Sequence, residues 1–152
     1  FTGADAGIQA SGNPNYVTIK GCTFIRFSGA GDAAIESIEG AGIGTNSGWV
    51  IRDNEFLSNA IHIDLKSYGA DIAFNHFSYT LNGVTTTTQI DLTGSQDVCV
   101  RENYFDVPFN QNGLSAMFVA GTRDRWIANA MGTAVLTPMT GRLWGIPVSG
   151  AA

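Results

Sequence analysis

Three acidic residues are spaced in a way that suits acid and base chemistry. They lie in short apolar segments: Glu36 in "AAIESI", Asp64 in "AIHIDL" and Asp91 in "TQIDL". If the aliphatic residues of these segments point inward, the acids point outward from one sheet, with His62 beside Asp64 on the same outer face. Carboxylates about 5 Å apart repel, which raises one pKa and gives the split that an acid/base pair needs. Ordinary outward polar residues on strands are the alternative interpretation.

A second set of polar residues directly follows a repeated asparagine. Glu55, His76 and Tyr104 take this position in "IRDNEF", "IAFNHF" and "VRENYF". On neighbouring strands these side chains come within reach of one another, so we expect a hydrogen-bonded row that either binds a ligand or is ordinary surface. Tyr79 in the loop "SYTLNGVTTTTQ" is a further candidate, together with His62. Loops of this neutral, aromatic composition suit sugar rings and hydroxyls, and equally a neutral protein interface.

An internal repeat determines where these residues lie. Its anchor positions are Cys22, Asn54, Asn75, Asn103 and Asn129, with spacings of 32, 21, 28 and 26 residues. A phenylalanine follows two residues later at Phe24, Phe56, Phe77 and Phe105. A second strand-like segment recurs between anchors, since Ile63, Ile90 and Met117 are 27 residues apart. The extra length before Asn54 lies in "EGAGIGTNSG", residues 39–48, and predicts an insertion at a turn.

A period in the twenties, with several short strands and no helical segment, predicts a parallel β-solenoid. Successive coils are then about 4.8 Å apart, so equivalent residues stack in columns. We expect the asparagines to adopt the left-handed conformation at a bend and to form a ladder outside, with the phenylalanines stacked inside. The leucine-rich-repeat consensus is missing. A sandwich stays open, because Asn-Gly pairs at residues 82–83 and 112–113 are typical of hairpin turns.

The motifs "IRDNEF", "IAFNHF", "VRENYF", "IHIDL" and "QIDL", within residues 8–131, carry a resemblance. The chain resembles the right-handed parallel β-helix of the pectate-lyase-like superfamily, most of all the β-helical modules of bacteriophage tailspikes and tail fibres. The resemblance implies an all-β, right-handed, single-stranded parallel β-helix of about five coils over residues 1–131. A C-terminal cap or intersubunit segment over residues 132–152 completes one domain. Relatives that hydrolyse polysaccharide use outward acids on one sheet, which here implies catalysis by Glu36, Asp64 and Asp91.

Charge and composition exclude several partners. The chain has 8 Lys and Arg against 13 Asp and Glu, a net charge of -5, which argues against nucleic acid and anionic membranes. No apolar run reaches the length of a membrane span. The histidines and cysteines match no closed ligand set, so we expect no metal and no cofactor. Cys22 and Cys99 lie about 14 Å apart in this arrangement, too far for a disulfide.

The expected assembly and function follow from the short stack and its sparse charge. We expect one face to be buried against copies of the chain, and the tailspike resemblance implies a homotrimer with other virion proteins and a cell-surface polysaccharide as partners. The start at Phe1 suggests a processed product or a piece of a longer protein. Our first hypothesis is a structural and glycan-binding module on the virion surface. The alternatives are a polysaccharide hydrolase, or less favoured a lyase, and a bacterial surface or secreted adhesin solenoid.

Overall fold

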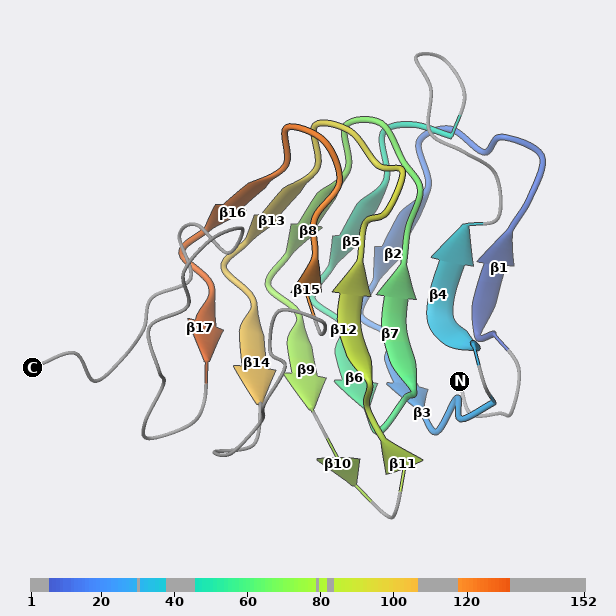
Figure 1. Cartoon of the computed structure of the whole chain (residues 1–152), viewed down its shortest axis with the longest axis vertical. Coiled ribbons are helices and arrows are strands. Elements are labelled where there is room, and N and C mark those ends of the chain that lie inside the picture. The colour runs from blue at the N-terminus through green and yellow to red at the C-terminus, as the bar shows by residue number, and fades with distance from the viewer. Residues whose placement is uncertain are drawn as a thin grey trace, which may run out of the picture.

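The computed structural model describes residues 6–29, 31–37, 46–78, 80–81, 84–106 and 118–131. Within these residues there is no helix, and three parallel sheets each contain five short strands (Figure 1). Sheet 1 contains β1 (Ile8–Ala10), β4 (Ala33–Ser37), β7 (Ile61–Asp64), β12 (Thr88–Asp91) and β15 (Phe118–Val119). Sheet 2 contains β2 (Thr18–Lys20), β5 (Val50–Arg52), β8 (Asp71–Ala73), β13 (Cys99–Arg101) and β16 (Arg125–Ile127). Sheet 3 contains β3 (Thr23–Ile25), β6 (Glu55–Leu57), β9 (His76–Ser78), β14 (Tyr104–Asp106) and β17 (Ala130–Met131).

The chain visits sheets 1, 2 and 3 in turn and then returns to sheet 1 one level further along the stack (Figure 1). The predicted all-β parallel solenoid is therefore confirmed. The sandwich alternative is wrong, because the strands of all three sheets pair in parallel. In the described part of the chain the antiparallel pairing is confined to one small hairpin, β10 (Thr80–Leu81) with β11 (Val84–Thr85).

The repeated asparagines form a hydrogen-bonded ladder at the corner between sheets 2 and 3. The amide nitrogens of Asn54, Asn75 and Asn103 each donate to Oδ1 of the next asparagine at 3.0 Å, ending at Asn129. Each of these oxygens also accepts the backbone N–H of the preceding anchor residue. Because Cys22 carries no amide, it joins only through its backbone N–H, which donates to Asn54 Oδ1 at 3.0 Å.

Two expectations about this ladder are wrong. The four asparagines are at most 3% exposed, so the ladder lies inside the coil and not outside it. The left-handed conformation belongs to the residue before each asparagine, as the φ of +56° at Asp53 and +53° at Glu102 shows. The reason is that the bend interrupts the ordinary strand ladder, and an inward amide provides the partners that the buried backbone groups of the bend require.

The phenylalanines stack inside the coil as expected. Successive rings from Phe24 to Phe105 lie 5.1, 4.8 and 4.8 Å apart at interplanar angles of 9–11°, and all four are fully buried. Stacked aromatic pairs contribute about 0.5–1.5 kcal/mol each beyond the burial of their area. The Phe column and the Asn ladder therefore hold successive coils in one register.

The aliphatic column of sheet 1 is continued by a different residue from the one that the spacing predicts. Ile63 pairs with Ile90 as expected, but Ile90 then pairs with Phe118 and not with Met117. The Phe118 ring is buried and packs edge-on against Phe105 at 4.8 Å and Trp126 at 5.9 Å. The buried Phe118 ring therefore occupies the position in this column that the spacing assigns to Met117.

Several predicted features fall where the structure gives no description. The expected cap over residues 132–152, Tyr79, Met117 itself and most of the insertion at residues 39–48 lie outside the described residues. Cys22 and Cys99 are both free thiols. None of the described segments forms a helix long and apolar enough to cross a membrane.

Candidate functional site

The three acids of sheet 1 lie in register on neighbouring strands. Glu36 pairs with Asp64, and Asp64 pairs with Asp91, so their carboxylates share the outer face; we call these three residues the acid row. Gln9 on β1 pairs with Glu36 and donates its amide Nε2–H to Glu36 Oε1. Asp91 Oδ1 accepts the backbone N–H of Thr93 at 2.8 Å. The strand spacing of about 4.8 Å brings the three carboxylates close together.

The surroundings of Asp64 shift the pKa of its carboxyl group. Partial burial raises the pKa of its carboxyl, the ammonium of Lys66 opposes this shift, and the negative charges of Asp91 and Glu36 add to it. A carboxyl group with a raised pKa holds its proton to a higher pH than a free carboxyl group does. A raised pKa at Asp64, in register with Asp91 on the next strand, is the perturbation that a proton donor requires.

His62 does not lie beside Asp64 on the outer face, so that prediction is wrong. Its imidazole is fully buried, with ring centroids 5.7 Å from both Phe56 and Phe77. Asn59 Nδ2 lies 3.0 Å from Nδ1, and the Ser78 carbonyl oxygen lies 2.9 Å from Nε2. This pattern fits a neutral ring that donates from Nε2 and accepts at Nδ1.

Burial also explains the protonation state of His62. Removal from water lowers its pKa to about 3, so the ring is neutral near pH 7. The error arose from assuming strict alternation along β7. His62 and Ile63 are consecutive and both fully buried, so inward and outward side chains do not alternate strictly along this strand.

Glu55, His76 and Tyr104 lie in register on the outer face of sheet 3. His76 Nδ1 is 3.8 Å from Glu55 Oε1, and the His76 and Tyr104 rings meet edge to face with centroids 5.2 Å apart. Tyr104 is 43% exposed, so part of its ring is open to solvent. We call these three residues the aromatic row. The structure brings them together, while their role in binding stays a prediction.

Phe74 is an exposed aromatic residue that the sequence reasoning missed. It is 43% exposed and has a φ of +55°, a conformation that is strained for a bulky side chain. The guanidinium carbons of Arg52 and Arg101 lie 5.5 and 5.2 Å from its ring centroid. The signal was available in the repeat, because the position before the anchor is charged or small in the other coils: Gly21, Asp53, Glu102 and Ala128.

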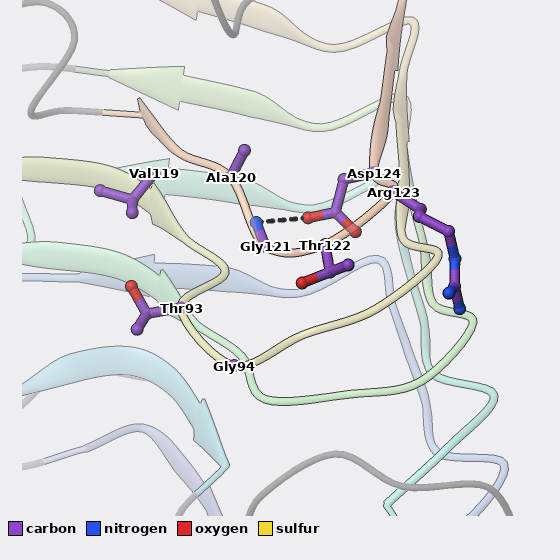
Figure 2. A pocket seen from close by; sticks show the side chains of 8 residues that line it. All are labelled: Thr93, Gly94, Val119, Ala120, Gly121, Thr122, Arg123 and Asp124. Atoms are coloured by element: carbon purple, nitrogen blue, oxygen red, sulfur yellow. Dashed lines mark hydrogen bonds between the residues drawn. The ribbon is translucent and has the colours of Figure 1, made fainter.

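An open hollow of about 560 Å³ lies at the turn that joins sheet 1 to sheet 2 near the end of the described stack (Figure 2). It is lined by Thr93, Gly94, Val119, Ala120, Gly121, Thr122, Arg123 and Asp124. No residue of this hollow was a candidate in the sequence reasoning. The motifs that repeat do not include it, so the pattern contained no signal for it.

Asp124 is held firmly at this hollow. Its Oδ1 accepts the Val98 N–H at 2.8 Å, and its Oδ2 accepts the Gly121 N–H at 2.6 Å, the bond drawn in Figure 2. Partial burial raises the pKa of this carboxyl, and the two backbone N–H groups oppose that shift. Arg123 is bound elsewhere, with Nε and Nη2 at 2.9 and 2.6 Å from the two oxygens of Asp97.

The described residues contain no group of three or more His, Cys, Asp or Glu side chains that could hold a metal ion. The acid row thus lacks the convergent geometry of a metal centre in this part of the chain.

The class of protein that the fold defines is a parallel β-solenoid. No protein-family model, no curated protein and no solved structure matches the chain. Membership of the pectate-lyase-like superfamily, and within it of the phage tailspikes, therefore stays a prediction from the repeat motifs. The solenoid scaffold supports many unrelated activities, so the surface rows and the hollow are the features that bear on function.

Proposed function

We propose that this chain is a structural, glycan-binding β-solenoid module of a virion surface protein such as a tail spike, tail fibre or decoration protein. The observation that supports it is the aromatic row. Tyr104 offers an exposed ring, and Glu55 and His76 offer hydrogen-bonding groups beside it. An aromatic ring with adjacent polar groups suits the apolar face and the hydroxyls of a sugar.

The scaffold fixes this row before any ligand arrives. The backbone N–H groups of His76 and Tyr104 donate to the carbonyls of Asn54 and Asn75 at 2.9 Å. Directly behind them lie the stacked rings of Phe77 and Phe105. Rigid, preorganised side chains lose little conformational entropy on binding, so a small surface row is able to contribute useful affinity.

The proposal includes assembly as a homotrimer, together with other virion proteins. Exposed apolar side chains support the burial of one face between copies, since Ile127 on β16 is 46% exposed and Phe74 at the adjoining corner is 43% exposed. Sedimentation velocity at micromolar concentration tests this assembly. A single species with the mass of one chain would contradict it.

The glycan-binding part is tested with a glycan array that uses the wild-type chain, Tyr104→Ala and Tyr104→Phe. We expect wild type and Tyr104→Phe to bind the same glycans and Tyr104→Ala to lose at least tenfold in affinity, because only the last variant removes the ring. Tyr16→Ala is the matched control, because it also removes an exposed tyrosine ring. Tyr16 is 83% exposed and is not part of the aromatic row. Binding of Tyr104→Ala with the affinity of the wild type, or no binding to any glycan, would contradict the proposal.

The second candidate is a retaining polysaccharide hydrolase that uses the acid row. Retaining glycosidases place two carboxyl groups about 5–5.5 Å apart, close to the strand spacing that separates Asp64 from Asp91. The raised pKa of Asp64 favours it as proton donor, with Asp91 as nucleophile and Glu36 as an assisting charge. A depolymerisation assay in which Asp64→Asn and Asp91→Asn keep the wild-type rate would eliminate this candidate.

A further inference from the structure

The hollow arises from a mismatch in turn length between neighbouring coils. Asp64, Asp91 and Val119 are in register at the ends of their strands, and Tyr68, Gln96 and Thr122 are bridged to one another after the turn. Three residues (65–67) separate Asp64 from Tyr68, and four residues (92–95) separate Asp91 from Gln96. Only two residues (120–121) separate Val119 from Thr122. The long turn therefore extends outward below a short turn that is drawn inward.

Two glycines make this mismatch possible. Gly94, in the long turn, has a φ of +86°, a left-handed conformation that favours glycine. Gly121, in the short turn, lies so close to the coil below that a Cβ atom would be 2.4 Å from the Ser95 carbonyl oxygen and 2.6 Å from that of Leu92. The hollow is therefore a built feature of the chain and does not depend on the position of a side chain.

We propose that this hollow binds one neutral, hydroxyl-rich pyranose unit of a glycan. The hydroxyl groups of Thr93 and Thr122 make no hydrogen bond with the described residues, and both line the space. Val119 and Ala120 provide apolar surface for the C–H face of a sugar ring. The volume lies within the range of about 300–1,000 Å³ that is typical of small-molecule sites.

The charges at the hollow favour a neutral ligand. Arg123 is neutralised by Asp97, and Figure 2 shows its guanidinium at the outer edge, pointing away from Thr93 and Gly94. Asp124 stays close to the space with both oxygens fixed by backbone N–H groups, and its free lone pairs accept sugar hydroxyls. An anionic sugar would be repelled by this carboxylate, and the Arg123 guanidinium, which also lines the space, is already paired with Asp97.

This inference rests on the proposed glycan-binding function, because it assigns a second subsite for the same class of ligand. The two subsites lie on different parts of the coil. The aromatic row is on sheet 3, whereas the hollow is at the turn between sheets 1 and 2. An experiment that reports on residues one by one therefore separates them.

The test is an amide nitrogen–proton correlation spectrum of the full chain, titrated in turn with glucose, galactose, mannose, N-acetylglucosamine and glucuronate. We expect at least one neutral sugar to shift the amides of Gly94, Ala120, Gly121 and Thr122, and glucuronate to leave them in place. Shifts confined to His76 and Tyr104 would overturn the hollow and leave the proposed function intact. An absence of shifts with every sugar would overturn both.

A double variant, Thr93→Val with Thr122→Val, removes the two hydroxyl groups at nearly constant shape. We expect its Kd for the sugar identified in the titration to rise at least about tenfold, which corresponds to about 1.4 kcal/mol. Thr18→Val, an exposed threonine on β2, is the matched control and should leave the Kd unchanged. An unchanged Kd in the double variant, or an equal loss in the control, would overturn the inference. If the double variant does not fold, the titration of the wild-type chain still decides.

Discussion

The two corners that join sheet 2 to sheets 3 and 1 differ in how constant their length is from coil to coil. Between sheets 2 and 3 every coil uses two residues: 21–22, 53–54, 74–75, 102–103 and 128–129. Between sheets 1 and 2 the strands of the last three described coils are separated by six, seven and five residues: 65–70, 92–98 and 120–124. The first corner is uniform because a buried amide ladder needs every coil in the same register. The second corner has no such ladder, so its length is free to vary and its surface acquires shape.

This contrast suggests a division of labour along one coil. Uniform corners give stability, since Asn54, Asn75 and Asn103 each bond to the coils on both sides. Variable corners give recognition surfaces, since a change of one or two residues opens a hollow without disturbing the strands on either side. The insertion predicted at residues 39–48 also falls between a strand of sheet 1 and the next strand of sheet 2, which is the variable side.

The largest effect is expected at the uniform corner. Asn75→Ala would leave the Ile51 carbonyl and the Asn54 backbone N–H without their side-chain partners inside the coil. Buried polar groups that lose a partner cost about 1–3 kcal/mol each, so we expect the free energy of unfolding in urea to fall by about 3–5 kcal/mol. Asn13→Gly is the control, because Asn13 is exposed with a φ of +58° that glycine adopts freely. A loss below about 1 kcal/mol for Asn75→Ala would show that the amide ladder does not stabilise the corner between sheets 2 and 3.

The next effect tests the variable corner. Gly121→Ala places a Cβ against two backbone oxygens of the coil below, and overpacking of this kind costs about 1–3 kcal/mol. The matched change is Gly94→Asn in the long turn. A Cβ at this position would meet nothing nearer than Lys66 Cγ at 3.8 Å, and asparagine tolerates a left-handed φ, so we expect a loss below about 1 kcal/mol. Equal losses of unfolding free energy for the two variants would show that space does not distinguish the turns.

The sequence predicts the uniform parts of the coil better than the variable turns. The Asn and Phe columns recur at a detectable period, so the solenoid and the neighbours Asp64 and Asp91 could be predicted from spacing alone. The side of the coil on which the asparagines lie could not, because polarity suggests the surface while an amide that is fully hydrogen-bonded is stable inside. The hollow could not be predicted either, since it exists only as a difference in length between two turns whose register has to be known first.

His62 extends the comparison to a buried titratable group on sheet 1. Its pKa of about 3 in the folded chain lies below the value near 6.5 of an unfolded histidine, so the unfolded state binds the proton more tightly. Stability from this residue is therefore complete above about pH 6.5 and is lost as the pH falls toward 3. We expect about 2 kcal/mol of loss between pH 7 and pH 5.

The control for this pH dependence is His62→Gln, which keeps hydrogen-bonding groups but does not titrate. Urea unfolding of both proteins at pH 7 and pH 5 isolates the contribution of the imidazole, because the carboxyl groups titrate alike in the two. A difference between wild type and variant that is the same at both pH values would show that His62 is not the buried neutral group described above.

The smallest effect is a gain at the end of the ladder. Cys22 occupies the anchor position of the first coil, where its backbone N–H donates to Asn54 Oδ1 but its side chain adds nothing to the amide ladder. In Cys22→Asn the new amide nitrogen is placed to donate to Asn54 Oδ1, as Asn54 itself donates to Asn75. One added neutral hydrogen bond is worth about 0.5–1.5 kcal/mol, so we expect an increase of that size in the unfolding free energy. Cys22→Ser, which removes the thiol without an amide, should not reproduce it. If Cys22→Ser and Cys22→Asn raise the unfolding free energy equally, the gain comes from removing the thiol. The added amide would then contribute nothing, and the packing of the buried coils, not the repeated asparagine, would account for the stability of this corner.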